Sequence, residues 1–496
     1  MMERRIRLLG IFLMVLFLGL FVQLNRIQFL DASSLANAPG NSRNITTQFS
    51  QNRGAILTAD GAVVADTVKS TDVYKYQRQY PNGPLYADIS GYDSILYGKD
   101  GIEAYYNSYL TPHSVTPNSL SSLLNPTTAP DNVTLTISSK LQSVAASALG
   151  KLRGAVIAID PSTGAILAMY SNPSYNPNLL SSHSGTTETK AWNSYIKDPS
   201  QPMLARAYRR RYPPGSTFKI VTSSAVYDHN PSLAVKSYPH VSSIALPDTT
   251  NRLHNYAYEV CGGQIGILLA VSCDTGFGQI GLDLGASSLA SEAKSFGFNQ
   301  TPPLDLYGVA SATFPSAASF STRLPTLAYS AIGQYDVAAT PLEMALATAG
   351  IANHGVIMAP HLMSEITGPQ ANVVKKYQNH PWLVATSAAT AAKVTSLMEG
   401  VVRFGTAGGI AIPGVAIAAK TGTAQLNLLA SNQSSPNGND NWMVAFAPAN
   451  HPTIAVAVVV PAQPGMSSNS TGAQYAGPVV KAMLSAAVNT SSVVGG

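Results

Sequence analysis

The sequence predicts an α+β protein in which an antiparallel sheet of five strands, flanked by helices, follows a strand-rich N-terminal part and one membrane helix. Three observations support this prediction. An uninterrupted apolar run precedes every other element. Two strand patterns then lie before a long segment of helical periodicity, and three more strand patterns follow it.

The first element is a run of fifteen apolar or glycine residues, 8–22, which follows three arginines. The apolar face continues past this run, so we predict an uncleaved transmembrane anchor over residues 8–27 behind a short cytoplasmic tail of residues 1–7. By the positive-inside rule the remainder then lies outside the cytoplasm. A cleaved signal peptide is the alternative, and it leads to the same compartment.

The composition limits the partners. Only 11% of the residues are charged and the formal net charge is +5, without a long basic block, so nucleic acid is excluded as a partner. The two cysteines, Cys261 and Cys273, fit an oxidising compartment in which they could pair. Two unpaired buried thiols are the alternative.

Residues 28–150 form the predicted N-terminal domain, a strand-rich pedestal. Short apolar runs at 55–57 and 62–65 flank an Asp-Gly turn, which is a hairpin signature. The domain ends with a strand pattern over 133–137 and a helical pattern over 138–149. No catalytic constellation stands out in this part.

Residues 151–490 form the predicted second domain, ahead of a tail of residues 491–496. Five segments have strand patterns: 155–159, 165–170, 415–423, 442–447 and 454–460. Between the second and the third of them, residues 171–410 are largely helical by period. A closing helix over 478–488 can cover the sheet.

The first motif with catalytic chemistry is S-x-x-K, which occurs three times: Ser194 with Lys197, Ser216 with Lys219, and Ser291 with Lys294. The middle copy is distinguished by the Pro-Pro-Gly turn of 213–215 and by the helix that begins there. Residues three apart share a helix face. A buried lysine has a lowered pKa, so the neutral amine of Lys219 can accept the Ser216 proton. A capping serine beside a solvent-exposed lysine is the alternative.

The second motif is Ser272-Cys273-Asp274, between a helix that ends near residue 270 and another that follows. This tight corner can direct a second hydroxyl and a polar side chain at Ser216. A serine or aspartate that only caps the following helix is the alternative.

The third motif is Lys420-Thr421-Gly422-Thr423, directly after a strand. The lysine can hold a substrate carboxylate or polarise the serine, the glycine lets a peptide lie close to the strand, and the Thr423 N–H can face an oxyanion. A phosphate-binding loop over 414–421 is the competing reading. It lacks one required glycine, and the strand continues where a helix should begin.

Taken in this order, the three motifs resemble those of penicillin-binding proteins and serine β-lactamases. Their spacing and the long N-terminal domain resemble a class B high-molecular-mass penicillin-binding protein, a monofunctional peptidoglycan D,D-transpeptidase. Further segments similar to that family are 52–56, 60–61, 101–103, 135–137, 333–334, 339–341 and 405–407.

The resemblance implies a role for each catalytic position. Ser216 is the acylated nucleophile and Lys219 its general base. Ser272 relays the proton to the leaving group, with electrostatic support from Lys420. The reaction is attack on the penultimate D-Ala of a stem peptide, release of the terminal D-Ala, and aminolysis by a neighbouring stem.

The resemblance also implies the substrate contacts. Thr421 and Thr423 bind the terminal carboxylate of the donor, Gly422 leaves room for it, and the N–H groups of Ser216 and Thr423 form the oxyanion hole. Asp274 stands where the family has asparagine, which both donates and accepts, whereas an ionised aspartate only accepts. We expect a carboxylate beside the acyl carbonyl to weaken the hydrogen bonding of that carbonyl unless Asp274 is protonated or paired with a lysine. A disulfide between Cys261 and Cys273 would brace this corner.

The implied partners are peptidoglycan stem peptides, β-lactam antibiotics and the cell membrane, with no cofactor and no metal. Residues 28–150 are too few to add a glycosyltransferase, so the resemblance implies a separate membrane-embedded peptidoglycan polymerase. The protein is expected to be single-pass, with its catalytic domain outside the cytoplasm. Whether it serves cell division or cell shape stays open.

Two other functions remain as alternatives. In a D,D-carboxypeptidase or β-lactamase, water rather than an amine resolves the acyl-enzyme; the anchor and pedestal argue against it. A non-catalytic division scaffold or β-lactam sensor is the other, and the seven residues before the anchor are too few for a signalling module.

Overall fold

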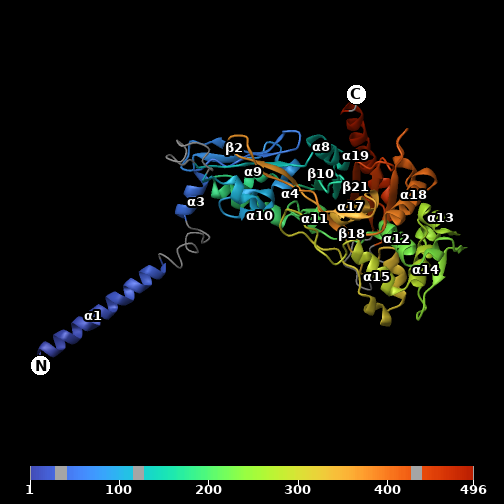
Figure 1. Cartoon of the computed structure of the whole chain (residues 1–496), viewed down its shortest axis with the longest axis horizontal. Coiled ribbons are helices and arrows are strands. Elements are labelled where there is room, and N and C mark those ends of the chain that lie inside the picture. Colours follow the sequence, from blue (N-terminus) through green and yellow to red (C-terminus); the bar gives the residue numbers. More distant parts are fainter. Residues whose placement is uncertain (1, 28–41, 115–127, 426–437, 495–496) are drawn as a thin grey trace.

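The computed structural model describes residues 2–27, 42–114, 128–425 and 438–494. Helix α1 (Met2–Asn25) lies apart from the folded remainder (Figure 1). Its segment Glu3–Asn25 has 23 residues and contains an 18-residue stretch with a mean hydropathy of 2.3 and no buried residue, so it is long and apolar enough to cross a membrane. The predicted domain start at residue 28 and the end of the predicted tail, 495–496, lie outside the described residues.

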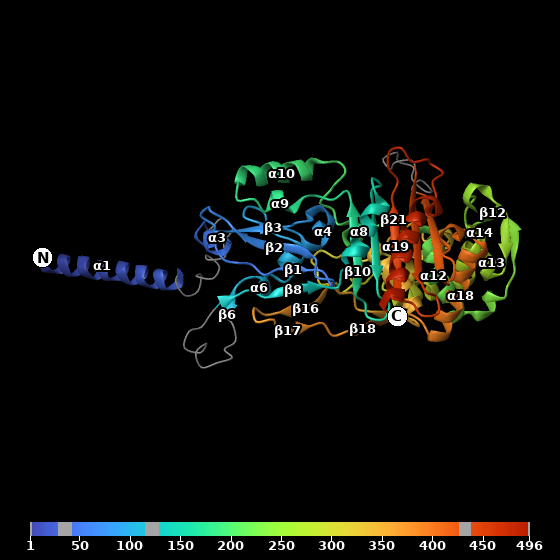
Figure 2. The same cartoon turned by 90° about the horizontal axis from the view of Figure 1, so that it is seen from above.

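The N-terminal sheet has six strands in the order β17-β16-β8-β1-β2-β3. Its strands are β1 (Ile56–Leu57), β2 (Val63–Lys69), β3 (Tyr76–Gln79), β8 (Asn132–Leu135), β16 (Met363–Thr367) and β17 (Val373–Lys376). The predicted hairpin is present, since β1 pairs antiparallel with β2. Strand β16 pairs antiparallel with β8 and places Ile366 opposite Val133. Two distant segments of the chain therefore build one sheet (Figure 2).

Short elements and helices complete the N-terminal part. They are α3 (Ser42–Phe49), α4 (Gly83–Ser90), β4 (Asp93–Ser94), β5 (Gly98–Lys99), α5 (Gly101–Tyr105), α6 (Asn107–Leu110), β6 (His113–Ser114), β7 (Thr128–Ala129), α9 (Pro177–Leu180) and α10 (Gly185–Lys197). Helices α9 and α10 lie over the same end of the molecule as β2 and β3 in Figure 2, although they come later in the chain.

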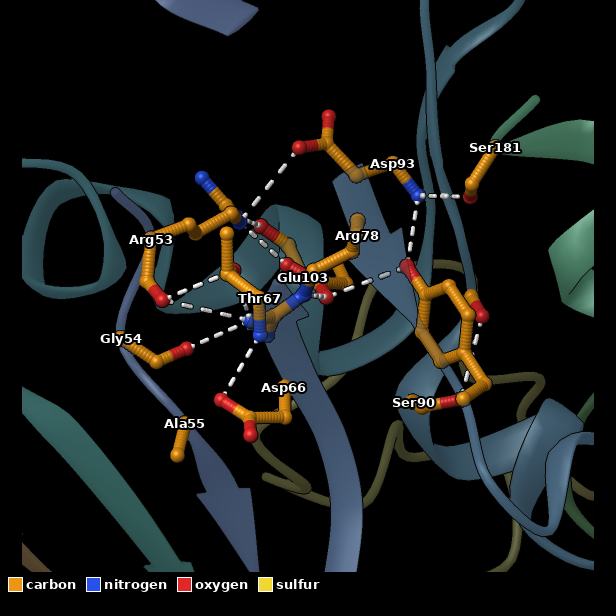
Figure 3. A network of polar contacts seen from close by, with 12 residues as sticks. Arg53, Gly54, Ala55, Asp66, Thr67, Arg78, Ser90, Asp93, Glu103 and Ser181 are labelled. Carbon is orange, nitrogen blue, oxygen red and sulfur yellow. Dashed lines mark hydrogen bonds and ion pairs between the residues drawn. The ribbon is translucent and has the colours of Figure 1, made fainter. Parts of the chain in front are cut away.

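A buried ionic network fixes this part (Figure 3). The Glu103 carboxylate is fully buried and accepts hydrogen bonds from Arg53 Nε and Arg78 Nε, each at 2.6 Å. Tyr80 donates its hydroxyl to the same carboxylate at 3.1 Å. Burial raises the pKa of Glu103, but the two guanidinium groups outweigh it and hold this pKa at about 2. The network therefore joins residues that lie far apart in the sequence.

The second sheet has five antiparallel strands in the order β10-β9-β21-β20-β19. The strands are β9 (Gly154–Ile159), β10 (Ile166–Asn172), β19 (Ala418–Gln425), β20 (Asn439–Ala447) and β21 (Ile454–Val460). This confirms the predicted sheet, with two strands before the long insertion and three after it. Strand β19 begins at Ala418 rather than at Val415, because Val415 closes a tight turn by donating its N–H to Ile412 O.

Helices cover both faces of the second sheet, since every residue of β9, β20 and β21 is buried. The helices that contact its strands include α8 (Ser139–Leu149), α17 (Pro341–Ala352) and α19 (Gly472–Val494). Thr340 caps α17 in a capping box with Glu343. The predicted closing helix, 478–488, corresponds to α19, which begins earlier, at Gly472, and ends later, at Val494.

The insertion between the two halves of the sheet holds most of the other helices: α11 (Arg206–Arg209), α12 (Lys219–His229), α13 (Ile265–Ala270), α14 (Asp274–Leu284), α15 (Ala286–Ser295), α16 (Pro325–Ala331) and α18 (Ala388–Phe404). It also contains short strands that the helical periodicity did not predict: β11 (Tyr238–Val241), β12 (Ser243–Ala245), β13 (Arg252–His254), β14 (Cys261–Gly263), β15 (Val356–Met358) and β18 (Pro381–Val384). Strands of three or four residues are too short to show a period of their own.

Candidate active site

A cavity of about 270 Å³ opens between the second sheet and the helices of the insertion. Its lining includes five residues that the sequence predicted: Ser216, Ser272, Asp274, Thr421 and Thr423. They come from three segments far apart in the chain, and each segment carries one predicted motif.

Ser216 lies in a 3₁₀ turn, Gly215–Phe218, that leads directly into α12. The chain enters this turn through Pro213, whose carbonyl accepts a hydrogen bond from Trp442 Nε1 of β20 at 2.9 Å. The Gly215 N–H donates to Gly333 O at 2.9 Å. The turn is therefore fastened to the sheet on one side and to the insertion on the other, and the hydroxyl of Ser216 faces the cavity.

Lys219 begins α12 one turn after Ser216 and is fully buried. Its Nζ donates to Asp274 Oδ1 and to Ser272 O, each at 2.7 Å. Ser216 Oγ lies 3.5 Å from the same carboxylate oxygen. The nucleophile candidate and the amine candidate thus meet at Asp274.

The corner between α13 and α14 positions the second motif. Ser272 has a φ of 60°, which a residue with a side chain rarely adopts. Cys273 forms a disulfide with Cys261 and donates its N–H to Leu268 O at 2.8 Å. These constraints hold the Ser272 hydroxyl between two amines, 2.7 Å from Lys420 Nζ and 3.4 Å from Lys219 Nζ.

Lys420 lies on β19, is fully buried and also donates to Thr421 O at 2.9 Å. Burial and the nearby charge of Lys219 lower its pKa well below the usual range, although Asp274 opposes this effect. Burial likewise lowers the pKa of Lys219, again against Asp274, which raises it. Low pKa values favour the neutral amines that can accept a proton.

Hydroxyl groups line the side of the cavity next to β19. Thr421 Oγ1 lies 2.6 Å from Thr406 Oγ1, and Thr423 Oγ1 accepts from the Gly472 N–H at 3.4 Å. Gly422 separates the two threonines of the strand. These hydroxyls form a set of donors that suits a carboxylate.

A side chain at Gly422 has no room. A Cβ there would lie 2.9 Å from Pro214 O and 2.9 Å from Thr217 Cγ2. The glycine therefore allows β19 to pack directly against the turn that carries Ser216.

The structure thus brings all three predicted motifs together, with Lys219 and Lys420 buried beneath the cavity. The sequence analysis did not predict four polar residues of the lining: Asn255, Tyr256, Glu259 and Thr471. The first three follow a short strand that has no periodicity, and no local signal marked them. Thr406 was noted only as part of a family-like segment.

Comparison with known proteins gives two family matches. Residues 154–485 match the penicillin binding protein transpeptidase domain, and residues 53–128 match the penicillin binding protein A dimerisation domain.

Full-length relatives are similar as well. The peptidoglycan D,D-transpeptidase PbpA of Mycolicibacterium smegmatis is 35% identical over 99% of this chain and 100% of the relative. The PbpA of Mycobacterium tuberculosis is 34% identical over 98% of this chain and 99% of the relative.

Solved structures agree in fold. The ceftriaxone acyl-enzyme complex of penicillin-binding protein A from M. tuberculosis has a TM-score of 0.79 and 33% identity, and covers 89% of this chain and 100% of that one. PBP2 of Pseudomonas aeruginosa, in complex with WCK 5153, has a TM-score of 0.73 and 30% identity, and covers 88% of this chain and 95% of that one.

Proposed function

The chain belongs to the penicillin-binding protein transpeptidase family and is a serine-type peptidoglycan D,D-transpeptidase that β-lactams acylate, and we propose that Ser216 is the residue acylated. The observation that carries this assignment is the contact set around one cavity. Ser216 Oγ and Lys219 Nζ both donate to Asp274 Oδ1. Lys420 Nζ donates a hydrogen bond to Ser272 Oγ.

The first half of the reaction uses the two buried amines. Ser216 Oγ attacks the carbonyl carbon of the penultimate D-Ala, and its proton passes to neutral Lys219. The bond to the terminal D-Ala breaks as the leaving nitrogen takes a proton through Ser272, whose hydroxyl Lys420 orients at 2.7 Å. The N–H groups of Ser216 and Thr423 stabilise the oxyanion.

The donor's terminal carboxylate binds at the hydroxyl-lined side, where Thr421 and Thr423 lie on β19. In the second half, the amine of a neighbouring stem replaces the released D-Ala and attacks the acyl carbon. Ser216 Oγ then leaves and takes up the proton that the attacking amine loses. The same serine opens the strained amide of a β-lactam.

The test is a cross-linking assay with the purified chain, a stem pentapeptide and an amine acceptor. Wild type is expected to release D-Ala and form the cross-linked product, and Ser216→Ala is expected to do neither. Ser291→Ala, which alters another S-x-x-K pattern outside the cavity, is the matched control and should keep full activity. Cross-linking that survives in Ser216→Ala would show that another residue is the nucleophile.

We also propose that α1 anchors the protein, with the N-terminal arginines in the cytoplasm and the catalytic domain outside. The apolar length of α1 and the disulfide of the insertion support this topology. The pedestal, residues 28–150 with β16 and β17 added to its sheet, would then stand between the membrane and the rest of the transpeptidase domain, 151–490. A separate membrane-embedded polymerase would supply the glycan strands. Protease protection of inverted and right-side-out vesicles tests the topology.

A further inference from the structure

The catalytic cavity contains a carboxylate that the proposed reaction does not use. Glu259 lines the cavity together with Ser216. It lies in the turn that joins β13 to β14, where Ala257 and Tyr258 both have positive φ values, 49° and 60°. Glu259 follows these two residues directly and lies on the exposed side of the turn, where it lines the cavity.

Side-chain contacts fasten this turn to the second motif at both ends. At its start, Asn255 accepts a hydrogen bond from the Thr275 N–H at 2.8 Å, and its amide donates to Glu259 O, also at 2.8 Å. At its end, Cys261 is joined by the disulfide to Cys273. Glu259 is therefore held at a fixed place relative to Asp274.

A third contact links the turn to the segment that precedes α19. Tyr256 donates its hydroxyl to Asn469 O at 2.7 Å, on the segment that precedes α19. Tyr256 and Thr471, from these two segments, both line the cavity. Glu259 thus lines a cavity to which both segments contribute side chains.

The two carboxylates of the cavity differ in their partners. Asp274 is paired with Lys219, whereas Glu259 is solvent-exposed and forms no ion pair within the part of the chain that the structure describes. Its charge is therefore available to a cation that enters the cavity. Stem peptides that cross-link through an amine bring such a cation.

We propose that Glu259 binds a primary ammonium group of the stem peptide and so selects substrates that carry a free side-chain amine. This inference rests on the proposed function. The ammonium can come from either of two sources, the donor stem whose D-Ala–D-Ala bond is cleaved or the acceptor stem before its amine is deprotonated.

The experiment compares stem peptides whose side-chain amine is free with peptides in which it is acetylated. The donor arm measures release of D-Ala without an acceptor. The acceptor arm keeps the donor acetylated. It compares the KM of a free-amine acceptor with the inhibition constant of its acetylated form, which has no nucleophile and can only compete for binding. In wild type the free amine is preferred in one of the arms. Glu259→Gln is expected to reduce that preference about fivefold, as for a solvent-accessible ion pair, whereas Glu259→Asp retains part of it.

The matched control is Asp248→Asn, which removes one negative charge from the same region outside the cavity. Asparagine tolerates the positive φ of 57° at this position. This variant is expected to keep the wild-type preference. If Glu259→Gln does not fold, the wild-type preference is measured at increasing salt concentration instead. An ion pair weakens as salt rises, so the preference should then fall.

Three results separate the outcomes. Loss of preference in the donor arm assigns the ammonium to the donor, and loss in the acceptor arm assigns it to the acceptor. A Glu259→Gln variant that keeps the wild-type preference in both arms, or a wild-type preference that salt does not change, overturns the proposal. Failure of penicillin to label Ser216 in wild type would instead overturn the proposed function.

Discussion

Lys219 Nζ lies 2.7 Å from Asp274 Oδ1, the oxygen that Ser216 Oγ also approaches at 3.5 Å. The aspartate that stands in place of the family's asparagine is therefore paired with a lysine. For this arrangement the sequence predicted no weakening of the acyl carbonyl's hydrogen bonding. Its charge raises the pKa of Lys219, while burial lowers this pKa more strongly. Asp274 thus opposes formation of the neutral base.

Asp274→Asn should lower the pKa of Lys219 further, because the one charge that raises it is removed. More of the amine is then neutral at a given pH, so the acid limb of the acylation rate moves to lower pH. At neutral pH, acylation by a fluorescent penicillin is retained or increased. The measurement is the acylation rate constant as a function of pH.

The control is Asp283→Asn, on the same helix, which removes a surface partner of Lys236 and should leave the profile unchanged. An acid limb that moves to higher pH, or a fall of about tenfold or more at neutral pH, about 1.4 kcal/mol in barrier, would show that the carboxylate has a catalytic role of its own.

Replacement of Cys261 and Cys273 by alanine should lower the free energy of unfolding by about 3 kcal/mol, because the closed loop restricts the unfolded chain. Urea unfolding without reductant measures this difference. A reducing agent should produce the same loss in wild type and none in the double variant. Recovery of both cysteines as free thiols from the unreduced protein would rule out the brace.

Glu103→Ala should destabilise the N-terminal part by about 3–5 kcal/mol, because Arg53 and Arg78 are left buried without a counter-ion. Glu399→Ala removes an exposed pair with Arg403 and should cost less than about 1 kcal/mol. Thermal unfolding compares the two variants, and equal losses would refute the role of the buried network.

The same network predicts a pH dependence. The folded pKa of Glu103 is about 2, below the ordinary value of 4.5. Its contribution is therefore present above pH 4.5 and is lost as the pH falls toward 2. Glu103→Ala should remove this part of the acid sensitivity, and an unaltered acid profile in the variant would contradict the assignment.

Gly422→Ala should reduce penicillin acylation at least about tenfold, because the added methyl forces β19 away from the Ser216 turn. Gly409→Ala is the matched control, since a Cβ there meets nothing within 4 Å. Stopped-flow acylation of both variants checks this prediction. Equal rates would mean that the strand and the turn can separate without loss of geometry.

The sequence predicted the elements that have strong local signals. Strand β21 matches the predicted 454–460. An entirely apolar run of this length between turn residues favours a buried strand, because helices are usually longer. The turn at Ser216 and the corner at Ser272 were predicted from proline, glycine and helix ends. These local signals were enough to place the three motifs near one another once the family resemblance was added.

Long-range pairing was not predictable in the same way. Strand β16 joins β8 across more than 200 residues, with Ile366 opposite Val133, and nothing near either strand identifies its partner. The direction of the Lys219 side chain, toward Asp274 and Ser272 O, likewise depends on how α12 packs against the α13–α14 corner. Sequence spacing fixes which groups share a helix face but not which of them bond.

The most direct test is to label the intact protein with a fluorescent penicillin, digest it and identify the modified peptide by mass spectrometry. We predict one adduct, on Ser216, which is absent from Ser216→Ala and unchanged in Ser291→Ala. An adduct on a different residue, or labelling that persists in Ser216→Ala, would contradict it.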